Sequence, residues 1–136
     1  MLRHPFNAII TGPTQSGKTH LVKMIIEDAD YVISPPIEKV LWYQHENSKR
    51  PEIHTHLPIV VKHNLDEIEC MPKSLIVIDD LYSEACNSDR VRDIFIRDTH
   101  HLDCSIILIS QNLFSSRESR HCTTINRNCK YIFLFN

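Results

Sequence analysis

The sequence predicts a three-layer α/β domain with a mostly parallel central sheet, and three observations predict it. Six short apolar runs bounded by turn residues have the length and composition of strands. Two of them, Leu75–Ile78 and Ile106–Ile109, are apolar at every position, as expected of strands covered on both faces of a parallel sheet. Two segments between these runs carry apolar residues at helical spacing. Alternating strands and helices are typical of this fold class.

Each element is expected for a local reason. The apolar runs predict strands, in chain order, at Asn7–Thr11, Lys39–Tyr43, Ile59–Lys62, Ser74–Asp79, Ser105–Ser110 and Lys130–Phe135. Their connections are long enough for the crossovers that parallel strands need. Helices are predicted over Lys18–Asp28 and Arg90–Asp98, each with one apolar face to cover the sheet. Prolines interrupt residues 34–58, so we expect irregular structure there.

Length and charge limit the function. The 136 residues suffice for one domain, and we expect residues 1–136 to form it. The 15 basic against 17 acidic residues provide no general basic field, so any contact with nucleic acid must be local. No apolar run approaches the roughly 20 residues of a membrane-spanning helix, and Met1 to Pro5 do not begin a secretory signal. We therefore expect an intracellular protein, neither secreted nor inserted in a membrane.

Cysteine and histidine do not form a recognisable metal motif. The five cysteines contain no C-x-x-C pair, so free thiols are the expectation. The histidine pairs His54 with His56 and His100 with His101 lack cysteine or acidic partners at ligand spacing, which disfavours a histidine metal site.

Residues 12–19, Gly-Pro-Thr-Gln-Ser-Gly-Lys-Thr, match the phosphate-binding pattern G-x-x-x-x-G-K-[ST] in full and stand between a predicted strand and a predicted helix. Its two glycines are the only ones in the chain, and they let backbone N–H groups and the helix start face phosphate. Lys18 is expected to reach the β and γ phosphates of ATP, and Thr19 to ligate Mg²⁺. The expected nucleotide-binding residues are Gly12, Pro13, Thr14, Gln15, Ser16, Gly17, Lys18, Thr19 and His20.

An apolar strand that ends in Asp79 and Asp80 has the pattern of a Walker B element. In a parallel sheet this strand end lies at the same edge as the phosphate loop. We expect Asp79 to hold Mg²⁺ through water, and Asp80 to orient or deprotonate the water that attacks the γ phosphate. The alternative is that the two acids only cap a turn. Aspartate reaches less far than the glutamate that is common at the second position in ring ATPases, which favours slow turnover.

Two further groups complete the expected site. Gln111 follows the strand Ser105–Ser110 and would emerge near the γ phosphate if that strand lies between the two motif strands, although a glutamine there can be a simple turn residue. Arg117 and Arg120 lie in a polar segment, where either could stabilise transition-state charge at a neighbouring subunit. A solvated surface is the alternative for both arginines.

Three stretches resemble a known family: Phe6 to Thr19, Leu75 to Leu81, and His100-His101 ahead of residues 107–114, Ile-Leu-Ile-Ser-Gln-Asn-Leu-Phe. Together they span nearly the whole chain and resemble the poxvirus-type DNA-packaging ATPases of Polinton or Maverick elements and adintoviruses, in the HerA/FtsK superfamily. The Ser-Gln-Asn-Leu-Phe stretch and the double histidine are more specific than the phosphate loop alone. Arg120 and Asn126 also resemble a segment of that family.

The resemblance implies a RecA-like P-loop NTPase fold with core strand order 5-1-4-3-2. It further implies an ATP-hydrolysing motor that works as a homo-oligomeric ring, drives double-stranded DNA into a capsid, and meets a portal-type partner. We expect such a motor at the viral replication site, in the host cytoplasm or nucleus. The chain stops at Asn136 where packaging ATPases usually continue, so a C-terminally shortened domain stays an alternative.

Three other functions are compatible with a phosphate-binding loop: a nucleotide-binding interaction module, a small-molecule kinase and a GTPase. A shortened domain could bind ATP without hydrolysing it and act as an interaction module. A small-molecule kinase would share the phosphate loop, but no arginine-rich lid is recognisable, and a GTPase is disfavoured because no Asn-Lys-x-Asp element occurs. For DNA contact the basic candidates are Lys49 with Arg50, or Arg90 with Arg92, through phosphates only and so without sequence preference.

Overall fold

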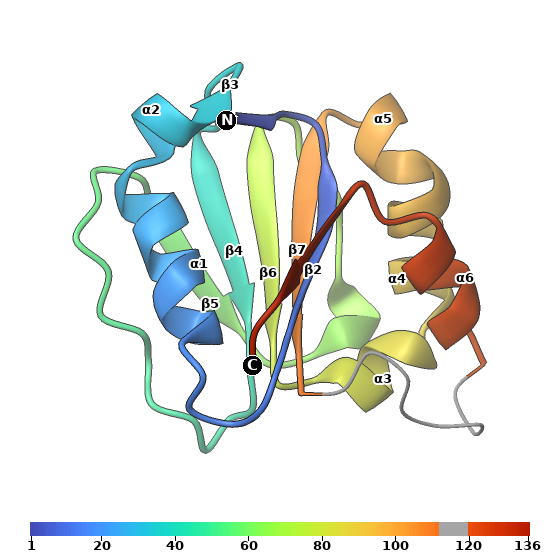
Figure 1. Cartoon of the computed structure of the whole chain (residues 1–136). Coiled ribbons are helices and arrows are strands. Elements are labelled where there is room, and N and C mark those ends of the chain that lie inside the picture. Colours follow the sequence, from blue (N-terminus) through green and yellow to red (C-terminus); the bar gives the residue numbers. More distant parts are fainter. Residues whose placement is uncertain (112–119) are drawn as a thin grey trace.

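The computed structural model describes residues 1–111 and 120–136 as an α/β domain built around a six-stranded sheet (Figure 1). The strand order is β5-β4-β6-β7-β2-β8, and every pairing between these neighbours is parallel. The strands are β2 (Asn7–Thr11), β4 (Lys39–Tyr43), β5 (Ile59–Lys62), β6 (Ser74–Asp79), β7 (Cys104–Ser110) and β8 (Tyr131–Leu134).

The sheet confirms the predicted fold class and strand order. With β2, β4, β6, β7 and β8 counted as core strands 1 to 5, the sheet reads 5-1-4-3-2, and β5 adds a sixth strand beside β4. β7 lies between β6 and β2, the two strands that carry the sequence motifs. The carboxyl ends of these three strands therefore meet at one edge, the lower edge in Figure 1.

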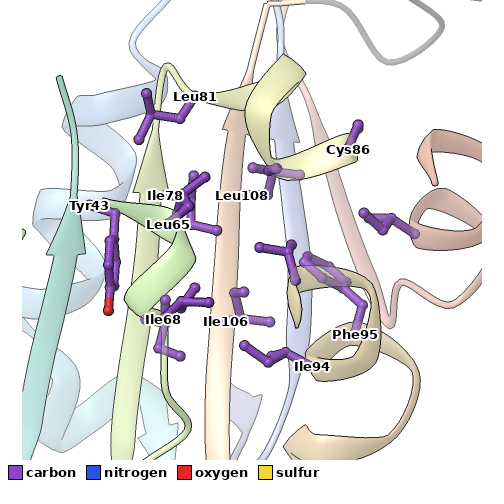
Figure 2. Close-up of a cluster of buried hydrophobic side chains, with 14 of the residues drawn as sticks. Tyr43, Leu65, Ile68, Ile78, Leu81, Cys86, Ile94, Phe95, Ile106 and Leu108 are labelled. Atoms are coloured by element: carbon purple, nitrogen blue, oxygen red, sulfur yellow. The ribbon is translucent and has the colours of Figure 1, made fainter. Parts of the chain in front are cut away.

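Helices cover both faces of the sheet. α1 (Lys18–Glu27) and α2 (Ala29–Val32) lie over one face, and α3 (Tyr82–Cys86), α4 (Asp89–Asp93), α5 (Thr99–His101) and α6 (Cys122–Arg127) over the other (Figure 1). Strand residues alternate between the two cores because successive side chains point to opposite faces. Ile76, Ile78, Ile106 and Leu108 pack beneath α3, α4 and α6 (Figure 2), whereas their neighbours, such as Val77, pack beneath α1.

The predicted boundaries of the six strands and of α1 agree with the structure to within about one residue. The second predicted helix, Arg90–Asp98, is not a single regular α-helix. Residues 90–98 do not make one α-helix: α4 ends at Asp93, a π-helical turn spans Ile94–Asp98, and α5 follows. The segment still buries Val91, Ile94 and Phe95, so its apolar spacing was sound. The unpredicted elements include the short helices α2, α3 and α6, a 3₁₀ turn at Leu65–Glu67 and a two-stranded parallel sheet of β1 (Leu2–Arg3) and β3 (Ile33–Ser34).

Candidate functional site

A pocket of about 260 Å³ opens at the edge where β2, β6 and β7 end. Residues of both sequence motifs line it, together with residues that follow β4 and β7. The lining consists of Thr14, Gln15, Lys18, Thr19, Ser48, Asp79, Asp80, Ile109, Ser110 and Gln111. The phosphate loop, the acidic strand end and Gln111, which lie far apart in the sequence, are therefore brought together.

The loop between β2 and α1 has the backbone that its sequence predicts. Gly17 has φ of 100° and directly precedes α1, and Gln15 also lies in the left-handed region with φ of 63°. The first N–H groups of a helix have no intrahelical partner, and within the described chain no side chain caps α1. The Ser16 hydroxyl is buried and has no hydrogen-bond partner among the described residues. These donors suit an anionic ligand such as phosphate.

Lys18 lies within the loop and is only 8% exposed. Its Nζ donates hydrogen bonds to the Gly12 carbonyl and, at 3.2 Å, to the Pro13 carbonyl. Burial lowers the pKa of Lys18, and the charges of Asp80 and Asp79 oppose that shift. The ammonium group is thus placed between the loop carbonyls and the two carboxylates.

Asp79 and Asp80 occupy different surroundings at the end of β6. Burial and, to a smaller extent, the nearby Asp80 raise the pKa of Asp79 to about 6, and Lys18 partly offsets their effect. Asp80 is exposed and has φ of 60°, in the left-handed region. The strand end therefore presents one partly buried carboxylate that gains from a cation and one that faces solvent.

Thr19 and Asp79 fit the expected magnesium ligands in chemistry and placement. Both line the same pocket, and a hydroxyl and a carboxylate are oxygen donors of the kind Mg²⁺ prefers. In residues 1–111 and 120–136 no three His, Cys, Asp or Glu side chains form a metal cluster. Magnesium bound with nucleotide needs no such cluster, because phosphate and water supply most of its ligands.

The remaining loop residues lie around the pocket rather than in its lining. Gly12 is buried behind the loop, and Pro13 is exposed. His20 is exposed and lines an adjoining hollow of about 290 Å³ with Gln15, Gly17 and other loop residues.

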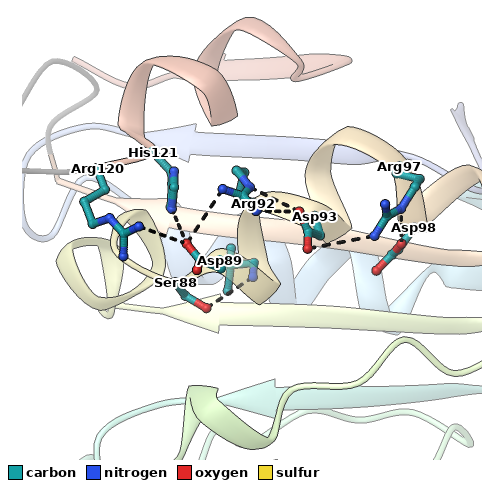
Figure 3. A network of polar contacts seen from close by, with 9 residues as sticks. Ser88, Asp89, Arg92, Asp93, Arg97, Asp98, Arg120 and His121 are labelled. Atoms are coloured by element: carbon teal, nitrogen blue, oxygen red, sulfur yellow. Dashed lines mark hydrogen bonds and ion pairs between the residues drawn. The ribbon is translucent and has the colours of Figure 1, made fainter.

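Arg120 lies outside the pocket. Its guanidinium forms an ion pair with Asp89 of α4 at 3.6 Å, and its backbone N–H donates to Asn87 Oδ1 at 3.1 Å. Asp89 also accepts from His121 at 2.6 Å and contacts Arg92 at 3.7 Å (Figure 3). Within its own subunit the Arg120 side chain thus joins a surface ion-pair network. The other candidate, Arg117, lies outside the described residues.

Sequence reasoning named Lys49 and Arg50 only as candidates for DNA contact and did not place the segment after β4 beside the phosphate pocket. Ser48 lines the phosphate pocket, and a second hollow of about 270 Å³ shares Thr19 and Asp79 with it. Lys23 and five residues of this segment line the second hollow: Gln44, Lys49, Arg50, Pro51 and Glu52. The available signal was topological: β4 is parallel to β6, so the polar segment after it must emerge at the same edge.

Similarity to known proteins is visible in structure and not in sequence. No protein-family model matches the chain. No curated protein matches it either. The DNA-packaging ATPase B204 from Sulfolobus turreted icosahedral virus superposes with a TM-score of 0.62 at 14% identity, covering 96% of this chain and 76% of B204.

A second solved structure has the same fold. The genome-packaging NTPase B204 from Sulfolobus turreted icosahedral virus 2, in complex with AMP, gives a TM-score of 0.62 at 12% identity over 96% of this chain and 74% of that protein. At such low identity these matches establish a shared P-loop NTPase-like fold.

Proposed function

We propose that the chain is an ATP-binding and ATP-hydrolysing motor domain that packages double-stranded viral DNA. One observation carries the proposal: Lys18, Thr19, Asp79, Asp80 and Gln111 converge on one pocket at the carboxyl edge of the sheet. The shared fold with two viral packaging NTPases, one solved with AMP, supports it.

The chain's own groups are suited to bind the triphosphate. The uncapped start of α1 and the unpartnered Ser16 hydroxyl offer neutral donors, and Lys18 offers a positive charge. Lys18 would exchange its bonds to the Gly12 and Pro13 carbonyls for phosphate oxygens. A pocket of about 260 Å³ is below the usual range for whole ligands, so it suits the phosphate groups and leaves the base outside.

Thr19 and Asp79 would hold the magnesium ion that accompanies ATP. The ion would neutralise charge on the transferring phosphoryl group. The partly buried Asp79 carboxylate gains from a nearby cation, because burial and Asp80 both disfavour its ionised form.

Asp80 and Gln111 are proposed to act on the attacking water. Asp80 is exposed in the pocket and would orient the water or accept its proton. Gln111, directly after β7, would sense the γ phosphate or help to position the same water. Both side chains come from strand ends, which hold them more firmly than a long loop would.

Hydrolysis is tested with purified protein, Mg²⁺ and ATP, with and without double-stranded DNA, beside Lys18→Ala and Asp80→Asn. We expect DNA-stimulated turnover that both variants lose. If ATP binds tightly but no turnover occurs under any condition, the chain is a nucleotide-binding interaction module. Phosphoryl transfer to a small molecule in place of water would indicate a kinase.

For DNA contact we favour Lys49 and Arg50 over Arg90 and Arg92. Arg90 donates to the Ile68 carbonyl through Nε and Nη2, and Arg92 is paired with Asp93. Arg50 also donates to a main-chain carbonyl, that of Ile59 at 3.2 Å, but this contact is exposed, whereas those of Arg90 and Arg92 are partly buried. The Lys49 side chain is 87% exposed, with Glu52 4.0 Å away. Lys49 is thus available to a DNA phosphate.

The DNA surface is tested by the salt dependence of duplex binding. Loss of two phosphate contacts in Lys49→Ala/Arg50→Ala should lower the slope of log K against log salt by about 2. Arg90→Ala/Arg92→Ala removes the same charge and should leave the slope unchanged. Equal slopes for wild type and Lys49→Ala/Arg50→Ala would exclude this surface.

We also propose a specific family for the motor. The resemblance of the motifs supports a poxvirus-type, Polinton-like member of the HerA/FtsK superfamily that acts as a homo-oligomeric ring with a portal-type capsid partner. In such a ring Arg120, or Arg117, would serve the neighbouring subunit's site. We expect the motor in the host cytoplasm or nucleus, and the described part of the chain contains no helix that could span a membrane.

A further inference from the structure

His45 connects the segment after β4 to the acidic end of β6. Its Nε2–H donates a hydrogen bond of 3.1 Å to the main-chain carbonyl of Asp80. Because a carbonyl oxygen can only accept, the proton must be on Nε2 of the ring. The two residues follow neighbouring parallel strands, so the contact crosses the edge of the sheet where the phosphate pocket opens.

The backbone at Asp80 needs such support. Asp80 has φ of 60°, a left-handed conformation that is unfavourable for residues with a side chain, although less so for aspartate and asparagine. Conformations of this kind persist where surrounding contacts hold them. The hydrogen bond from His45, although exposed to solvent, restrains the carbonyl of this residue, whose direction is linked through the backbone to that of the carboxylate.

The segment that presents His45 is itself held firmly. The Gln44 side chain is buried; its Oε1 accepts from Trp42 Nε1 at 3.1 Å, and its Nε2 donates to the carbonyls of Ser48 and Lys49 at 3.2 and 3.3 Å. The Ser48 N–H closes the turn by donating to the His45 carbonyl at 3.1 Å. His45 therefore projects from a rigid turn.

The main chain of Gln44 ties this turn to the neighbouring strand. Its N–H donates to the Lys62 carbonyl at 3.0 Å, and its carbonyl accepts from His63 Nδ1 at 2.9 Å. All of the polar groups of Gln44 are thus occupied in holding residues 44–49 in place. A buried polar residue so fully bonded gives a fixed geometry to whatever it supports.

We propose that His45 is a positioning residue that fixes the backbone of Asp80 and thereby aims its carboxylate into the phosphate pocket. The inference rests on the proposed ATPase function only where it predicts a change in kcat. The structural consequence, a changed conformation at residues 79–81 when the hydrogen bond is lost, does not depend on hydrolysis.

The kinetic test compares variants of His45 that lack a hydrogen-bond donor or carry it at a different distance from the main chain. His45→Ala should lower kcat about tenfold and change KM for ATP less than twofold, because an ångström-scale shift of a catalytic group slows chemistry without weakening nucleotide binding. His45→Gln carries an amide donor at about the reach of Nε2 and should restore most of kcat. His45→Asn carries the same amide group on a shorter side chain that does not reach the Asp80 carbonyl, so it should resemble His45→Ala. His54→Ala, at an exposed histidine that does not line the phosphate pocket, is the control.

A double variant separates positioning from a general weakening of the site. Because Asp80→Asn is expected to lose DNA-stimulated turnover, the comparison uses the residual single-turnover rate of ATP hydrolysis. In the Asp80→Asn background, His45→Ala should cause no further loss of this rate, because the carboxylate that it positions is already gone. A further tenfold loss in that background would contradict the proposal.

Absence of ATP hydrolysis by the wild type would refute the proposed function but not the role of His45. Solution NMR then tests whether His45 positions Asp80. The ¹⁵N shifts of His45 should show the Nε2–H form, and the amide signals of Asp80 and Leu81 should move in His45→Ala and return in His45→Gln. Unmoved amide signals in His45→Ala, or equal shifts in both variants, would overturn the proposal.

Discussion

Gly12 and Phe135 lie so close that a β-carbon added to Gly12 would stand 2.6 Å from the β-carbon of Phe135 and 3.0 Å from its carbonyl oxygen. The Phe135 N–H also donates to the Thr11 carbonyl at 2.9 Å, which holds the residue after β8 against the start of the phosphate loop. The glycine at position 12 is thus required by packing against the chain's own last strand as well as by the loop that follows.

Gly12→Ala should therefore destabilise the fold by about 1–3 kcal/mol, because either β8 or the phosphate loop must shift. Denaturant unfolding monitored by circular dichroism measures the change. Gly17→Ala is the matched comparison: its β-carbon would meet Phe135 at 3.5 Å, an ordinary contact, and only the left-handed backbone is strained. If Gly12→Ala unfolds at the same denaturant concentration as the wild type, the packing argument is wrong.

Asp79→Asn should stabilise the nucleotide-free protein at pH 7.5. The folded pKa of Asp79 is raised from 3.8 to about 6, so the folded state binds its proton more tightly than the unfolded state. The resulting cost is fully present above pH 6 and disappears as pH falls below the unfolded value near 4. The variant removes about 1–3 kcal/mol of that cost at neutral pH.

Unfolding at pH 7.5 and pH 4.5 measures this effect, and the gain should shrink at the lower pH. Glu46→Gln, at an exposed position, controls for the loss of a negative charge. A gain that is equal at both pH values would show that ionisation of Asp79 is not its cause. The gain in stability should accompany a loss of Mg²⁺-dependent activity, the trade-off expected at a functional site.

The sequence allows the sheet and most of the pocket to be predicted, because their signals are local. Strands buried on both faces read as continuous apolar runs, and parallel strands bring Asp79 and Gln111 to the edge of the phosphate loop. The segment after β4 has no comparable signal: its residues are polar, and Gln44 and His45 depend on partners that follow the neighbouring strands, His63 and Asp80. Likewise, the cis pairing of Arg120 with Asp89 depends on how α4 packs.

Asn7 illustrates a buried polar residue whose role only the structure reveals. It begins β2 and is 4% exposed. Its Nδ2 donates to the carbonyls of Phe95 and Asn128 at 2.8 and 2.7 Å, and its Oδ1 accepts from the Lys130 N–H at 2.5 Å. One side chain thus joins the sheet to the π-helical turn and to the connection before β8.

Asn7→Leu should cost about 1–3 kcal/mol, because it leaves the carbonyls of Phe95 and Asn128 without the Asn7 amide group. The Lys130 N–H keeps a bond to the main-chain carbonyl of Asn7, at 3.2 Å. Thermal unfolding measures the loss. Asn47→Leu, in the exposed turn after β4, is the control and should change stability little. An Asn7→Leu protein as stable as the wild type would mean that the carbonyls of Phe95 and Asn128 find other partners.

The proposed role of Arg120 at a neighbouring subunit's site can be tested separately from its ion pair with Asp89. Its ion pair with Asp89 is solvent-exposed, with 65% and 56% of the two side chains accessible, so Arg120→Ala should change stability by less than about 1 kcal/mol. If Arg120 acts on a neighbouring subunit, Arg120→Ala should nevertheless lose most ATP hydrolysis. Mixing Arg120→Ala with Asp80→Asn should then restore part of it, because some interfaces combine an intact Asp80 with an intact Arg120 from the other variant. A mixture no more active than the sum of its parts would leave Arg120 a surface residue of the Asp89 network.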